Sequence, residues 1–195
     1  MKIVAMEGIQ TKDTEKYAVI LTNQLKAKGY KVETTTFDRN NALQNDICHH
    51  TYFKQPLKDI ASIQFLIAAD IQNKQAQLEE WESNGVDYVV INRYTLWQEA
   101  YAAVNGFDTH FVNVLQKYIR QPDYEVLLDV PSTQLQTYQD ESHRKALEDM
   151  KAYYLRESKS INNATWKEGN VKIIDVSEDE AKIEEEIFQF VVHDE

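Results

Sequence analysis

The sequence predicts an α/β protein built on an open five-stranded parallel sheet with helices on both faces. Two observations carry this prediction. Short apolar or β-branched runs alternate along the chain with longer stretches whose apolar residues recur at helical spacing. The run at residues 88–91 is also apolar without interruption, which is typical of a parallel strand covered on both faces. The length of 195 residues fits a single domain over residues 1–195.

The first half of the chain predicts three strands and two helices. Residues 2–6 form a short apolar run before a Glu-Gly turn, so we expect a buried strand. Residues 14–28 carry apolar side chains at helical spacing and are followed by glycine, which predicts a helix and its end. Residues 30–37 are rich in threonine and predict a second strand. Residues 57–83 predict one long helix that ends at Asn-Gly, and residues 86–91 predict the third strand.

The second half continues the alternation. Residues 95–118 predict a helix with a break at an Asn-Gly pair. Residues 124–130 are apolar and stop at a proline, which predicts the fourth strand. Residues 141–158 predict a helix with an apolar face, and the apolar run at residues 171–176 predicts the fifth strand. Residues 178–192 predict a closing amphipathic helix, whose acidic start suits the helix dipole.

Charge and composition exclude several classes of function. Lysine and arginine total 21 against 32 aspartates and glutamates, so the net charge of -11 argues against a nucleic-acid partner. No apolar run is long enough for a membrane span or a signal peptide, so we expect a cytoplasmic protein without a membrane partner. Cys48 is the only cysteine, and its neighbours His49 and His50 have no third ligand at coordinating spacing. We therefore expect no disulfide and no metal site.

Ligands of an open parallel sheet bind beyond the carboxyl ends of its strands. The segments that follow the first four expected strands are residues 7–15, 37–41, 92–98 and 131–136. The first of them lies between a strand and a helix, where phosphate-binding loops occur. From residue 7 to residue 16 it reads Glu-Gly-Ile-Gln-Thr-Lys-Asp-Thr-Glu-Lys.

Short motifs extend this observation down nearly the whole chain. After Glu7-Gly8 they are Gly29-Tyr30-Lys31-Val32, Phe37-Asp38-Arg39, Phe65-Leu66-Ile67-Ala68-Ala69-Asp70, Asn92-Arg93-Tyr94 and Leu128-Asp129-Val130-Pro131. In this order they resemble the motifs of the thymidylate kinase family. The resemblance implies the fold of the P-loop nucleoside monophosphate kinases. It also implies a homodimer, for which residues 57–83 and 95–118 would supply the helices.

The resemblance fails where the family binds ATP. The family's loop carries Gly, Lys and Thr where this chain has Asp13, Thr14 and Glu15, so two carboxylates would face a triphosphate. Lys12 and Lys16 flank this position and are the weak candidates for a catalytic lysine, with solvated surface cations as the alternative interpretation. The loop is thus degenerate, although Gly8, Thr11 and Thr14 stay candidate phosphate-binding residues.

Two further losses concern the transfer step. Residues 132–139 contain no arginine, whereas family members carry arginines in a lid at this place. Asn92 replaces an aspartate that helps to organise magnesium in the family. We therefore expect no cofactor, and ATP with Mg²⁺ only if the chain is nevertheless a kinase.

The acceptor side is better preserved. Arg39 and Arg93 match the arginines that hold the monophosphate in the family, and Gln98 and Tyr101 match residues at the base and the deoxyribose. Each arginine could instead pair with a local carboxylate such as Asp38 or Glu99. The thymine preference does not carry over, because three residues that would read the nucleoside are replaced, by Gln10, Ile67 and Ile71.

Three functions stay open. The leading interpretation is a protein that has lost phosphoryl transfer and binds a deoxynucleoside monophosphate, a related phosphate ligand or a protein partner. The second is an active deoxynucleoside monophosphate kinase in which Lys12 or Lys16 takes the role of the missing lysine. The third is a structural or regulatory dimeric module. A shared fold does not choose among them, because function depends on the site.

Overall fold

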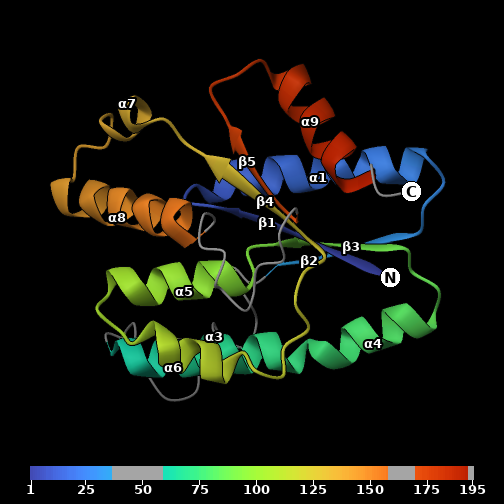
Figure 1. Ribbon diagram of the computed structural model, residues 1–195, viewed down its shortest axis with the longest axis horizontal. Helices are drawn as coiled ribbons and strands as arrows, with labels where there is room; N and C mark the ends of the chain where they lie inside the picture. The colour runs from blue at the N-terminus through green and yellow to red at the C-terminus, as the bar shows by residue number, and fades with distance from the viewer. Residues whose placement is uncertain (37–58, 158–169, 193–195) are drawn as a thin grey trace.

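A parallel sheet forms the centre of the computed structural model, which describes residues 1–36, 59–157 and 170–192 (Figure 1). Its five strands are β1 (Lys2–Gly8), β2 (Val32–Thr36), β3 (Tyr88–Asn92), β4 (Tyr124–Asp129) and β5 (Val171–Asp175). They lie in the order β2-β3-β1-β4-β5, and every neighbouring pair is parallel. This confirms the predicted fold class.

β1 lies in the middle of the sheet and pairs with β3 on one side and β4 on the other. Ala5 is paired with Ile91 of β3 on one side and with Glu125 of β4 on the other. Successive side chains of a strand point to opposite faces, so the apolar residues of β1 and β3 supply two cores rather than one. All five residues of β3 are buried, as its uninterrupted apolar run predicts.

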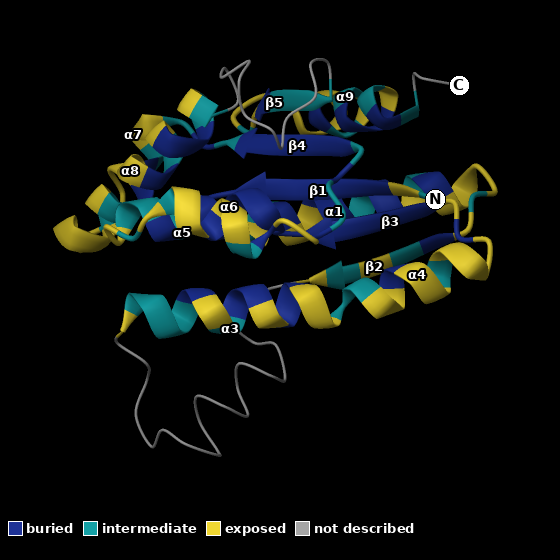
Figure 2. Cartoon of the chain, turned by 60° about the horizontal axis from the view of Figure 1, so that its bottom comes forward, coloured by how far each residue is buried: buried dark blue, intermediate teal, exposed yellow. Residues whose placement is uncertain are grey.

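One face of the sheet is covered by α1 (Thr11–Ala27) and α9 (Glu180–Val192), which lie together above it in Figure 1. The core on this side consists of buried residues from both helices and from the strands beneath them, among them Val4, Met6, Leu21, Leu25, Val126, Ile183 and Ile187. The buried residues of each helix pack against the sheet, whose strands β1, β3 and β4 are largely dark blue in Figure 2.

The other face carries more helices. They are α3 (Ile60–Asn73), α4 (Gln75–Ser83), α5 (Thr95–Val104), α6 (Thr109–Leu115), α7 (Ser132–Leu135) and α8 (Glu141–Glu157). The second core joins buried residues of these helices to the sheet, among them Ile71, Leu78, Leu96, Leu135 and Tyr154. α6 lies alongside α3, since the rings of Phe65 and Phe111 meet edge to face with centroids 5.8 Å apart.

Several boundaries differ from the prediction. β1 continues to Gly8, past the expected end at residue 6, and α6 ends at Leu115 rather than at residue 118. The expected long helix over residues 57–83 is divided at Lys74, whose Nζ donates to Thr36 O at 2.7 Å and so reaches the edge strand β2. α1 begins at Thr11 rather than at residue 14. α7 is a single turn that no periodicity announces. The expected break at Asn105-Gly106 is confirmed, with φ of Gly106 at 71°.

In the part of the chain that the structure describes, no helix combines the length and apolar character needed to span a bilayer. Within the same residues, no three histidine, cysteine, aspartate or glutamate side chains are grouped so that they could hold a metal ion. Cys48, His49 and His50 lie outside the described residues.

Candidate functional site

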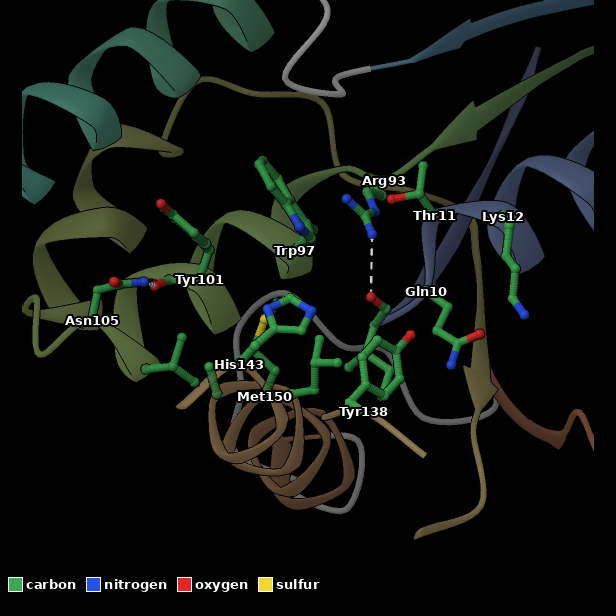
Figure 3. Close-up of a pocket in the computed structure, with 14 residues that line it drawn as sticks. Gln10, Thr11, Lys12, Arg93, Trp97, Tyr101, Asn105, Tyr138, His143 and Met150 are labelled. Carbon is green, nitrogen blue, oxygen red and sulfur yellow. Dashed lines mark hydrogen bonds between the residues drawn. The ribbon is translucent and has the colours of Figure 1, made fainter. Parts of the chain in front are cut away.

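A pocket of about 480 Å³ opens beyond the carboxyl ends of β1 and β3. The start of α1 and the turn after β3 form one end of it, and α5 and α8 form its walls (Figure 3). This is the edge of the sheet at which the sequence predicts a ligand site. Its size falls in the range of about 300–1,000 Å³ that is usual for small-molecule sites.

Arg93 is placed in this pocket by an unusual backbone conformation. Its φ of 59° lies in the left-handed region, which costs free energy for any residue other than glycine. Two hydrogen bonds to β1 hold it there: Arg93 N donates to Met6 O at 2.9 Å, and Tyr94 N donates to Glu7 Oε1 at 2.9 Å. The hydrogen bonds to the central strand thus stabilise the strained backbone conformation of Arg93.

The side chain of Arg93 brings a positive charge into the pocket wall. It is only 8% exposed, its Nη2 donates to Ile9 O at 3.4 Å, and its Cζ lies 5.5 Å from the ring centroid of Trp97. Its Nε has no hydrogen-bond partner, and no carboxylate of the described residues forms an ion pair with it. Glu99, the local carboxylate that could have paired with it, instead accepts a 3.3 Å hydrogen bond from Tyr153 Oη.

Aromatic side chains form the α5 wall. Trp97 and Tyr101 are four residues apart, so they lie along one face of α5, and Arg93 lines the same pocket from the turn before the helix. The Trp97 and Tyr101 rings are stacked with centroids 5.6 Å apart and 19° between their planes. Trp97 is not among the predicted site residues, although its spacing of four residues from the candidate Tyr101 was the signal that could have placed it in the site.

The α8 wall was not predicted. His143, Ala146, Leu147 and Met150 share one face of this helix and line the pocket opposite Trp97. Tyr138 precedes the helix and lies beside His143, with ring centroids 5.4 Å apart. The regular spacing along α8 indicated a shared face, but only the packing of α8 beside α5 shows that this face meets a cavity.

The connection from β1 to α1 is short. Only Ile9 and Gln10 separate the two elements, and residues 11–15, which the resemblance aligns with the rest of the phosphate loop, lie in the helix. Gly8 serves close packing, because a Cβ there would lie 3.1 Å from both Leu128 O and Thr14 Cγ2. The Thr14 hydroxyl is buried and donates to Thr11 O at 3.0 Å.

The structure separates the predicted site residues into two groups. Thr11, Lys12, Arg93 and Tyr101 line the pocket. Gly8 and Thr14 pack beneath it, and Lys16 points elsewhere, with its Nζ 2.7 Å from Glu180 Oε2 of α9. Arg39 lies outside the described residues.

Gln98 does not reach the pocket either. It is fully buried, its Nε2 donates to Gln64 O at 3.1 Å, and its Oε1 accepts from Gln116 Nε2 at 3.1 Å. Ile67 and Ile71, which replace base-contacting residues, are packed in the core at 2% and 0% exposure. The position that the resemblance assigns to the base is therefore filled with side chains.

Buried carboxyl groups lie behind the pocket. Burial raises the pKa of Glu7 to about 7 and that of Glu99 to about 8, while Arg93 acts in the opposite direction on Glu7. Glu125 on β4 is buried as well, and its pKa is raised well above the usual value, with Glu7 and Glu99 adding to the shift. The described carboxyl groups therefore balance the charge of Arg93 only in part.

Comparison with known proteins gives one family. The family model described as thymidylate kinase matches residues 12–187. A solved thymidylate kinase from Candida albicans is similar in structure, with a TM-score of 0.74 and 14% sequence identity, over 99% of this chain and 92% of that chain. No curated protein sequence matches the chain. The first two findings agree with the resemblance carried by the motifs, and the structural one confirms the fold.

Proposed function

Because this chain belongs to the thymidylate kinase family, we propose that it binds a deoxynucleoside monophosphate or a related phosphate ligand and does not transfer phosphate from ATP. One observation carries the binding half of the proposal. Arg93 is buried, is held by β1 and faces an open pocket, and no carboxylate of residues 1–36, 59–157 or 170–192 forms an ion pair with it. A phosphate would supply the negative charge and the acceptors that this guanidinium lacks, and the guanidinium can donate two hydrogen bonds to it.

The start of α1 supports the other half. ATP needs a loop whose successive backbone N–H groups converge on the phosphates, together with a lysine and a hydroxyl. Here two residues connect β1 to α1, and Asp13 lies in the first turn of the helix. Arg93 is also the only arginine that lines the described pocket. These residues do not fit a magnesium-bound triphosphate, so we assign no role in the function to ATP. We also propose that the protein meets its ligand in the cytoplasm.

A calorimetric titration tests this function. We expect dTMP or another deoxynucleoside monophosphate to bind the wild-type protein, and Arg93→Gln to weaken that binding at least about tenfold, since a charge-assisted bidentate contact is lost. Arg156→Gln is the matched control, because Arg156 is exposed on α8 and pairs with Glu157. Equal binding by wild type and Arg93→Gln would refute the assignment of Arg93.

A second candidate function has one observation in its favour. Lys12 lines the pocket, so an active kinase could use it in place of the missing loop lysine. In that case the protein would convert a deoxynucleoside monophosphate to the diphosphate with ATP and Mg²⁺, and Lys12→Ala would abolish turnover. Lys16→Ala would change little, because Lys16 is paired with Glu180 outside the pocket. Our proposal predicts no turnover above background for any of the three proteins.

We also propose that the protein is a homodimer through a surface that we call the α3/α6 patch, formed by Phe65, Phe111, Val114 and Tyr118. These side chains are 51%, 37%, 53% and 77% exposed. Phe65 of α3 contacts Phe111 of α6, Val114 lies on α6 and Tyr118 follows it, and exposed large apolar residues of this kind mark interaction surfaces. The patch also fits a protein partner of a purely structural module. Sedimentation of wild type and Phe111→Glu separates the two, because a homodimer dissociates in the variant, whereas a monomeric wild type favours another partner.

A further inference from the structure

The pocket around Arg93 has a cationic end and a mainly apolar end, which also holds the polar side chains of Asn105 and His143. Arg93, Lys12 and Thr11 lie at the end formed by α1 and the turn after β3. Val104 and Met150 line the part between α5 and α8. Figure 3 shows Lys12 and Tyr101 at opposite ends of the group. A ligand that satisfies both ends must itself be anionic at one end and apolar at the other.

The charge of the lining limits how the ligand is built. None of the described lining residues is an aspartate or glutamate, although acidic residues outnumber basic ones by 32 to 21 in the chain. Arg93 lies deep in the wall, while Lys12 is exposed at the mouth. One fixed cation and one solvated cation suit a single phosphate-like group. A polyphosphate would also approach Asp13 in the first turn of α1.

A phosphate group alone would leave most of the pocket empty. A phosphate group fills roughly the space of two or three water molecules of about 30 Å³ each, which leaves most of the 480 Å³ free. The Trp97 and Tyr101 rings, which are stacked on each other, border this space, and Met150 faces it from α8. Aromatic rings and a thioether pack favourably against another planar ring.

On the other side of α5, the described side chains leave no space for the planar ring of a ligand. Gln98 is tied to Gln64 and Gln116, and the core side chains Ile67 and Ile71 fill the space beside α3. We propose that this pocket binds a small ligand with one phosphate-like group and one planar ring, and that the ring packs between α5 and α8 against Trp97, Ala146 and Met150. The proposal rests on the proposed function for the anionic group, and it adds where the ring lies and which residues select it.

Phenyl phosphate and inorganic phosphate are the probes that separate the two parts. By titration calorimetry, we expect wild type to bind phenyl phosphate at least about tenfold more tightly than inorganic phosphate, because only the former buries a ring. Ala146→Phe fills the α5/α8 space and should remove this advantage, while the affinity for inorganic phosphate stays within about twofold. Ala152→Phe is the matched control, because Ala152 is exposed on the same helix and lies outside the pocket lining.

The outcomes show whether the ring site alone or the proposed function as well is refuted. If inorganic phosphate binds and is lost in Arg93→Gln, but phenyl phosphate binds no more tightly, the ring site is refuted and the proposed function stands. If the advantage of phenyl phosphate survives in Ala146→Phe, the ring lies elsewhere and the inference is also refuted. If the wild type binds neither probe, both proposals fail. The comparison of the two probes on wild type remains decisive even if Ala146→Phe does not fold.

Discussion

At the scale of single residues, Arg93 shows how one side chain is prepared for an anion. Its left-handed backbone is held by Met6 O and, through Tyr94 N, by the Glu7 carboxylate. Glu7 therefore has two roles. Its Oε1 accepts the hydrogen bond that holds the turn after β3, and its negative charge, when ionised, offsets the positive charge of Arg93. The two roles act in opposite directions on anion binding, which makes them separable by substitution.

Glu7 should thus behave as a positioning residue. Glu7→Gln keeps an oxygen for Tyr94 N but removes the negative charge, so we expect inorganic phosphate to bind a few-fold more tightly, with the gain confined to pH values above the Glu7 pKa of about 7. Glu7→Ala loses the acceptor and should weaken binding about tenfold by releasing the turn. Calorimetry at pH 6 and pH 8 measures both effects.

Glu125→Gln is the control for this pair. It removes a buried carboxyl group on the same side of the sheet that makes no hydrogen bond to the turn after β3, so phosphate affinity should change less than about twofold. Identical effects of Glu7→Gln and Glu7→Ala would contradict the separation of charge from geometry.

At the scale of the elements, the junction of β1, β4 and α1 determines what the loop can bind. The tight β1–α1 connection brings α1 onto the sheet at once, and Gly8 makes the close contact between the three elements possible. The glycine therefore has a packing role here, beside the phosphate-binding role that the resemblance implies for it.

Gly8→Ala tests the packing role. The added Cβ would lie 3.1 Å from Leu128 O and from Thr14 Cγ2, so we expect the free energy of unfolding to fall by about 1–3 kcal/mol. Adding Thr14→Ser removes the Cγ2 contact and should restore part of the loss, while the backbone contact with Leu128 O remains. Urea denaturation of the two variants measures this. A stability unchanged by Gly8→Ala, or a double variant no better than the single one, would speak against the contact.

The elements also show how far sequence reasoning reaches. The uninterrupted apolar run of β3 and the Asn-Gly pair before α6 were sufficient to place both features, because they are local signals. No glycine or proline marks the division of the long helix at Lys74, and the Lys74 side chain contacts Thr36, which lies far away in sequence. The α8 wall of the pocket depends on how α8 packs beside α5, so its residues could not be assigned to the site from their spacing alone.

At the scale of the whole molecule, buried carboxyl groups connect the sheet to both pocket walls. Glu7 on β1, Glu125 on β4 and Glu99 on α5 influence one another, with Glu157 of α8 acting on Glu99. The groups facing them are the cation Arg93 and the phenols of Tyr153 and Tyr154, whose pKa values burial also raises. One cation does not balance three carboxylates, so the folded state favours their protonated forms.

Stability should therefore fall as pH rises through neutrality. The folded pKa values of Glu7 and Glu99, about 7 and about 8, exceed the value of 4.5 expected in the unfolded chain, so between these limits the folded protein binds more protons. The stabilisation is complete below about pH 4.5 and is lost as pH approaches 8. For Glu7 alone the shift corresponds to about 3 kcal/mol.

Urea denaturation between pH 5.5 and 8.5 measures this slope. We expect the free energy of unfolding to decrease steadily over this range, and Glu99→Gln to flatten the decrease, because a neutral amide loses no proton. Glu80→Gln is the control, since Glu80 is exposed on α4 and should leave the slope unchanged. The carboxylates whose pKa is lowered, such as Asp59 and Asp175, are exposed and act only below about pH 4, so they do not mask the effect. Stability that rises from pH 6 to pH 8 would show that the buried carboxyl groups are ionised at little cost in the folded protein.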